Sequence, residues 1–195
     1  MLKIREARRN DVAGIARVQV ETWRSTYPGL IPDHVLVSMS HHRHQAAWAH
    51  ALDHPRPQYA ALVAAVDGAS GGWAGLDDAA GDGVVGFGSC GPARDPSLRL
   101  KGEICTLYVL PEYHDLGIGR ALLHGMFDCL LARGMDSAVV WVLAENPSRF
   151  FYEALGGQRV AERNECMWGT VLSEAAYGWP DLQAVRISHL AQRRF

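Results

Sequence analysis

The sequence has no marked excess of charge of either sign. It contains 19 lysines and arginines against 21 aspartates and glutamates, which gives a formal net charge of -2. Proteins that bind nucleic acid gain much of their affinity by neutralising phosphates with a basic surface. We therefore expect no nucleic-acid partner.

Long apolar runs are also missing. No stretch approaches the roughly 20 apolar residues that a membrane-spanning helix needs, and residues 1–6 lack the apolar centre of a signal peptide. The sequence therefore predicts a cytoplasmic protein with no membrane partner.

Cysteine pairs suited to a disulfide framework or a zinc site are missing as well. The cysteines are far apart and form no Cys-x-x-Cys pair: Cys90, Cys105, Cys129 and Cys166. We expect four reduced, mostly buried thiols and no metal. His41, His42 and His44 do not change this expectation, because neighbouring residues of a helix point in different directions. A solvated helix face is the simpler interpretation.

Segments with strand and helix character alternate along the chain. Strands are expected at residues 3–7, 59–66, 84–90, 103–109, 139–143, 159–168 and 171–177. Helices are expected after Asn10 or Asp11, at residues 32–52, from Gly117 onward and at residues 147–155. Residues 68–83, rich in Gly, Ala, Ser and Asp, read as a flexible hairpin tip. This order indicates an α/β fold with a mixed sheet, and one domain over residues 1–195.

A glycine-rich turn follows the clearest strand. Gly117 and Gly119 leave backbone N–H groups unobstructed at the start of a helix, where about half a positive charge favours a diphosphate. Glycines that permit tight helix–strand packing are the alternative. The turn lacks the lysine and hydroxyl of a nucleotide loop, and Leu122 stands where a dinucleotide loop has its third glycine. The ligand indicated is a diphosphate that needs no metal.

Two motifs in register resemble those of the GCN5-related N-acetyltransferase (GNAT) superfamily. The first is Leu107-Tyr108-Val109-x-Pro111-Glu112-Tyr113-His114-x-x-Gly117-x-Gly119-Arg120, and the second is Asn146-Pro147-x-Arg149-x-Phe151-Tyr152-Glu153-x-Leu155-Gly156-Gly157. The resemblance implies a mixed, mostly antiparallel sheet flanked by helices. It also implies acetyl-coenzyme A (acetyl-CoA) as co-substrate, bound by residues from about 103 to 160.

The resemblance assigns roles in cofactor binding. The strand Leu107, Tyr108 and Val109 would pair with the pantetheine arm, in a slot made where strand 139–143 splays away. Asn146 would reach the pantetheine amides, and Phe151 would pack near the thiol end. The pyrophosphate would be held by backbone N–H groups of His114, Asp115, Leu116, Gly117, Ile118, Gly119 and Arg120. The superfamily usually has glutamine or arginine in place of His114, which can still donate one hydrogen bond or can simply face solvent.

Acetyl transfer to an amine needs a base, an oxyanion donor and an acid. For the acid we choose Tyr152, because a phenol suits a departing thiolate and the superfamily commonly has tyrosine here; a packing role is the alternative. For the base we choose Glu103, acting directly or through water. It precedes Leu107 by four positions, so both side chains should share a face; a solvated strand end is the alternative. By resemblance, a backbone N–H near Leu107 would bind the oxyanion.

Trp23 and Tyr27 are the expected acceptor residues. The segment Trp23-Arg24-x-x-Tyr27-x-Gly29 resembles the first-helix segment of one GNAT subset, which commonly lines the acceptor side. Trp23 and Tyr27 lie four positions apart on one helix face, where they could surround an amine or belong to the core. The favoured function is acetylation of a small-molecule amine. The alternatives are acetylation of a protein N-terminus or lysine, and an acyl-CoA-binding module without activity. Residues 177–181 could touch the acceptor or a partner subunit, and aromatics that we expect to be exposed there favour a homodimer.

Overall fold

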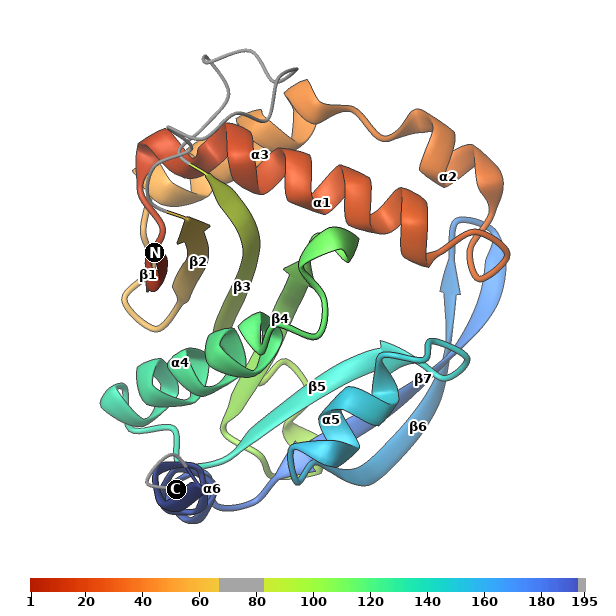
Figure 1. The fold of residues 1–195 in the computed structure, drawn as a ribbon. Helices are drawn as coiled ribbons and strands as arrows, with labels where there is room; N and C mark the ends of the chain where they lie inside the picture. Colours follow the sequence, from red (N-terminus) through yellow and green to blue (C-terminus); the bar gives the residue numbers. More distant parts are fainter. Residues whose placement is uncertain (67–82, 193–195) are drawn as a thin grey trace.

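The strands form one mixed sheet. The computed structural model describes residues 1–66 and 83–192, and its seven strands lie in the order β1-β2-β3-β4-β5-β7-β6 (Figure 1). Their bounds are β1 Leu2–Glu6, β2 Ala60–Val66, β3 Val84–Pro92, β4 Gly102–Val109, β5 Ala138–Leu143, β6 Gln158–Met167 and β7 Thr170–Trp179. The β4–β5 pair is parallel and the other neighbours are antiparallel. The expected fold class is confirmed.

Helices cover both faces of this sheet (Figure 1). Their bounds are α1 Val12–Thr26, α2 Asp33–Ser38, α3 His41–Asp53, α4 Ile118–Ala132, α5 Arg149–Ala154 and α6 Leu182–Gln192. On one face, α1 buries Ile15 and Val18 against β3. Helix α3 lies beside α1, and its Trp48 packs against the same cluster. On the other face, α4 supplies a continuous apolar stripe that packs on the central strands, and α5 adds Tyr152. Both stripes follow the helical spacing of apolar residues in the sequence.

The elements differ from the expectations in one helix and in one element that was not expected, and one expectation lies almost wholly outside the described residues. The single helix expected over residues 32–52 is two helices, because the backbone adopts an extended conformation at Ser40. The Ser40 side chain accepts from Arg43 N at 3.4 Å and caps α3. The terminal helix α6 was not predicted. The hairpin tip expected at residues 68–83 lies outside the described residues except for Gly83.

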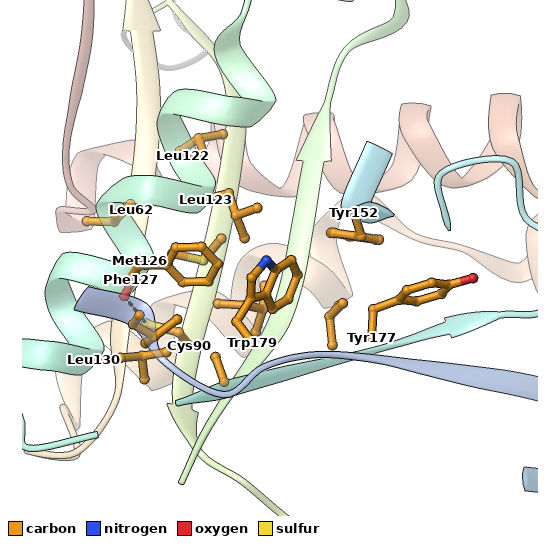
Figure 2. Close-up of a cluster of buried hydrophobic side chains, with 14 of the residues drawn as sticks. Leu62, Cys90, Leu122, Leu123, Met126, Phe127, Leu130, Tyr152, Tyr177 and Trp179 are labelled. Atoms are coloured by element: carbon orange, nitrogen blue, oxygen red, sulfur yellow. Dashed lines mark hydrogen bonds between the residues drawn. The ribbon is translucent and has the colours of Figure 1, made fainter. Parts of the chain in front are cut away.

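The aromatic residues at the end of β7 are buried, so the expectation that they face an acceptor or a partner subunit is wrong. Tyr177 and Trp179 are 1% and 0% exposed. The Trp179 ring lies beside that of Phe127, 5.1 Å away (Figure 2). Its Nε1 donates to Leu155 O at 2.9 Å. Gly157 permits this packing, since a Cβ there would lie 2.9 Å from the indole. The predicted homodimer therefore loses this support.

The cysteines are all free thiols, but they are less buried than expected. Cys90 is buried beneath α4, Cys105 and Cys129 are half-buried, and Cys166 is exposed on β6. Burial raises the pKa of Cys90 to about 12 and that of Cys105 to about 11. These two thiols therefore stay protonated and unreactive at neutral pH.

Candidate active site

A slot opens between β4 and β5. The two strands pair only from Gly102 to Ile104 of β4, opposite Ala138 to Val140 of β5. Leu110 N donates to Val85 O on β3 at 2.9 Å, so the alternation of a strand directs the N–H and C=O groups of Val109 and Leu107 away from β3. These groups face the slot. An extended ligand could therefore pair with them as an added strand.

A β-bulge changes which side chains of β4 share a face. The β3–β4 register shifts between Ser89, opposite Thr106, and Cys90, opposite Ile104, which leaves Cys105 as the extra residue. As a result Ile104 and Leu107 both pack toward α4. Glu103 therefore lies on the opposite face from Leu107, and the expectation that they share a face is wrong.

Glu103 is buried in an ion pair outside the slot. Its side chain is 1% exposed. Its Oε2 accepts from Arg94 N at 2.9 Å, and its Oε1 accepts from Arg94 Nε at 2.9 Å and also from Nη2. This contact raises the pKa of Arg94. Glu103 does not line the cavity described below, whereas Arg94 does.

We expect Glu103→Gln to lower stability more than catalysis. The amide cannot accept from both the backbone and the guanidinium of Arg94 as the carboxylate does, so we expect a loss of about 1–3 kcal/mol in the free energy of unfolding. Thermal unfolding measures this loss, and the pH profile of kcat/KM measures catalysis. A normal melting temperature, together with loss of the acid limb of the profile, would instead identify Glu103 as the base.

The turn between β4 and α4 presents unpaired backbone N–H groups. Asp115 and Gly117 have positive φ values of 60° and 76°. The first helical hydrogen bond runs from Ala121 N to Gly117 O at 3.0 Å. The N–H groups of Ile118, Gly119 and Arg120 therefore have no acceptor within the helix. In the described part of the chain, no side chain caps this helix. A Cβ at Gly117 would meet nothing within 4 Å, so the turn is an open cradle that suits a diphosphate.

His114 departs from the role expected of it. Its backbone N–H donates to Pro111 O at 3.1 Å, and its Nε2 donates to Val109 O at 2.9 Å. The imidazole is solvent-exposed at the end of β4. His114 thus ties the turn to the strand, and its own amide is already used.

Phe151 and Asn146 flank the slot from the α5 side. The Phe151 ring packs on the turn, since a Cβ at Gly119 would lie 3.3 Å from it. Asn146 is 2% exposed, and its Oδ1 accepts from Ser148 N at 2.9 Å. The Asn146 carbonyl therefore fixes the start of α5.

One cavity of about 650 Å³ joins the slot to a second region beneath α1. At one end it is lined by Leu107, Val109, His114, Gly117, Gly119 and Phe151. At the other end it is lined by Thr22, Trp23, Tyr27, Arg94, Trp168 and Glu174, which we call the acceptor end. The tip of the β6–β7 hairpin reaches the end of α1 here (Figure 1), with the Trp23 and Trp168 rings 6.2 Å apart.

Tyr152 lines the cavity between its two ends. The side chain is 6% exposed and packs edge to face on Phe151, with ring centroids 5.2 Å apart. Burial, and then the neighbouring Tyr27, raises the pKa of Tyr152 well above that of an exposed tyrosine. The phenol is therefore protonated throughout the physiological range and can donate a proton.

The two predicted acceptor residues lie together in the cavity wall. The rings of Trp23 and Tyr27 are 5.1 Å apart. The pKa of Tyr27 is raised, first by burial and then by the charge of Glu174, and its hydroxyl lies near Tyr108. The Tyr108 ring packs with the cluster beneath α1, 5.5 Å from the Phe87 ring, and burial raises the pKa of its phenol.

Sequence reasoning missed several residues of the acceptor end. Glu174 on β7 and Trp168 at the hairpin tip line the cavity, as do Thr22 and Trp141. Thr22 is 5% exposed, and its Oγ1 has no hydrogen-bond partner in the described part of the chain. The sequence offers one weak signal, an acidic residue in the middle of a mostly apolar strand at 171–177.

Within residues 1–66 and 83–192, no group of three or more His, Cys, Asp or Glu side chains could hold a metal ion. In the same residues, no helix is both long enough and apolar enough to cross a membrane.

Comparison with known proteins gives consistent results. The model of the acetyltransferase (GNAT) family matches residues 15–157. YuaI of Bacillus subtilis, named as an uncharacterised N-acetyltransferase, is 36% identical over 186 residues, which cover 95% of this chain and 97% of YuaI. Among solved structures, yncA of Salmonella typhimurium with acetyl-CoA has a TM-score of 0.63 at 20% identity, covering 93% of this chain and 94% of its own. The paiA N-acetyltransferase of Thermoplasma acidophilum with coenzyme A has a TM-score of 0.61 at 18% identity, covering 90% and 98%.

Proposed function

Because this chain belongs to the acetyltransferase (GNAT) family, we propose that it transfers an acetyl group directly to the primary amine of a small molecule in a ternary complex. The chain is an acetyl-CoA-dependent N-acetyltransferase. The small-molecule acceptor and the residue roles are the proposed part. The observation that carries the proposal is the single cavity that joins the slot beside β4 to an aromatic and acidic end.

The residues of the slot fit acetyl-CoA, which supplies a reactive thioester when bound. The N–H groups of Ile118, Gly119 and Arg120 have no intrahelical acceptor and can hold the diphosphate. The N–H and C=O groups of Leu107 and the N–H group of Val109 can pair with the extended pantetheine arm, whereas Val109 O already accepts from His114 Nε2. The open space beside Gly117 supports this fit, because any side chain there would narrow the cradle.

The chain then needs to orient an amine and control two protons. Tyr152 holds a proton at Oη, beside the slot, where a departing thiolate can accept it. The amine must lose its own proton before it attacks, and water in the open cavity can carry that proton away. Glu103 is turned away from the cavity and bound by Arg94, so we propose that it positions Arg94 rather than acting as a direct base.

A panel of amines offered with acetyl-CoA tests this function by release of free thiol. We expect turnover with small primary amines that exceeds turnover with peptides carrying a free N-terminus or a lysine. Faster acetylation of the peptides would replace the small-molecule proposal with protein acetylation. Tight binding of coenzyme A without thiol release for any acceptor would indicate a binding module.

A further inference from the structure

Glu174 is a carboxylate that the mechanism above does not use. It lies on β7 opposite Arg163 of β6, its side chain is 14% exposed, and it lines the acceptor end. Arg163 Nε and Nη2 both contact Glu174 Oε2, each at 2.8 Å. Among the described residues, none donates a hydrogen bond to Oε1. One oxygen of a mostly buried carboxylate is therefore left for a ligand.

The charges around Glu174 favour a cation. Arg163 is shared, because it also lies 3.4 Å from Glu165 Oε1. Its guanidinium is held over the Trp141 ring at 3.9 Å from the centroid, so it cannot easily turn away from β7. Arg94, the arginine that lines the acceptor end, is neutralised by Glu103. Two carboxylates facing one guanidinium leave one negative charge in excess, and a cationic acceptor complements it.

Two further features of the acceptor end indicate a ligand with an apolar body. The Trp23 ring lies 5.1 Å from Tyr27 and 6.2 Å from Trp168, so three aromatic rings line one wall. Such a wall packs well on an alkyl or aromatic group next to an ammonium. Thr22 adds a buried hydroxyl that has no partner among the residues that the structure describes, and a polar ligand group would satisfy it.

We propose that Glu174 Oε1 binds the ammonium group of the acceptor, and that the acceptor is a small monoammonium compound with an alkyl or aromatic body. This inference deepens the proposed function and depends on it. Glu174 thereby selects cationic amines and places the nitrogen at the acceptor end of the cavity. No other described residue of that end carries a negative charge toward the ligand.

Benzylamine is a suitable probe, because it carries one ammonium group on a compact aromatic body. Its binding to the complex of the protein with coenzyme A can be followed through tryptophan fluorescence. We expect Glu174→Gln to weaken benzylamine binding on the order of 10-fold or more, since a charge-assisted contact becomes a neutral one. The Kd for coenzyme A itself should not change.

Glu165→Gln is the matched control. It removes the other carboxylate that pairs with Arg163, yet Glu165 does not line the cavity. Benzyl alcohol, which has the same body without the charge, supplies a second comparison and should bind both variants equally. Equal weakening of benzylamine by the two substitutions, or no binding of benzylamine to the unaltered protein, would overturn the inference. Failure of the proposed function would look different, because no amine would then release thiol from acetyl-CoA.

Discussion

Replacing Tyr152 with phenylalanine is expected to lower kcat about 10²-fold or more, while the Kd for coenzyme A stays nearly unchanged. Loss of a positioned general acid typically costs this much. Phenylalanine keeps the ring contact with Phe151, so the helix α5 and the slot should remain intact. Steady-state thiol release gives kcat, and calorimetric titration with coenzyme A gives the affinity.

The pH profile adds a second readout for Tyr152. Burial raises the pKa of this phenol above its ordinary value near 10, so it stays protonated at alkaline pH. The kcat of the unaltered protein should therefore not fall as the pH approaches 10. A clear alkaline decline that disappears in Tyr152→Phe would show that the phenol ionises earlier than its burial implies.

Tyr177→Phe is the matched control for this prediction. The Tyr177 ring stacks on that of Tyr152 at 6.5 Å, and its hydroxyl donates to Glu153 Oε1 at 2.9 Å, beyond the cavity lining. Removing this hydroxyl should leave kcat close to normal. Equal slowing of both variants, or a loss of coenzyme A affinity with normal turnover in Tyr152→Phe, would contradict the role of Tyr152 as acid.

Local patterns in the sequence predict the elements that build the slot. The apolar stripe of α4 and the glycines of the turn are local signals, and Gly117 does take a positive φ at the position where the helix begins. Strand β4 was expected one residue from its observed start. These features depend on nearest neighbours along the chain, which sequence reasoning can assess.

Features that depend on pairing between distant strands could not be predicted in this way. The bulge at Cys105 arises from the register of β4 against β3, and one extra residue moves Glu103 to the other face. From the local sequence alone Trp179 was expected to be exposed, but Gly157 leaves room for its ring to pack against Phe127. The expectation that Glu103 and Leu107 share a face and the argument for a dimer from exposed aromatics both failed for this reason.

The composition of the acceptor end could not be predicted from the sequence for the same reason. It combines Trp23 of α1 with Trp168 of the β6–β7 hairpin and Glu174 of β7, which lie far apart in sequence. The resemblance to known acetyltransferases concerned the cofactor motifs, which lie between residues 103 and 160. It therefore carried little information about side chains on the last two strands, where we propose that the acceptor is recognised.

Replacing Gly117 with aspartate is expected to abolish useful binding of coenzyme A, with a loss of affinity on the order of 100-fold. A Cβ there would meet no atom within 4 Å, so the backbone leaves room for a side chain to begin. Aspartate also tolerates a positive φ better than most residues and is a favourable residue at a helix N-cap. The fold should therefore survive, while a carboxylate occupies the cradle and repels the diphosphate. Calorimetric titration with coenzyme A measures the loss.

Gly117→Asn separates charge from shape. Asparagine has nearly the same size and the same tolerance of positive φ, so it should reduce affinity far less than aspartate. Gly134→Asn, at the other end of α4, reports the cost of positive φ alone, because Gly134 has a φ of 79° and open space around it. We expect each asparagine variant to lose about 1 kcal/mol in the free energy of unfolding. If Gly117→Asp bound coenzyme A as well as Gly117→Asn does, the backbone amides of this turn could not be the anion site, since a fixed negative charge among them would then have no effect on a diphosphate.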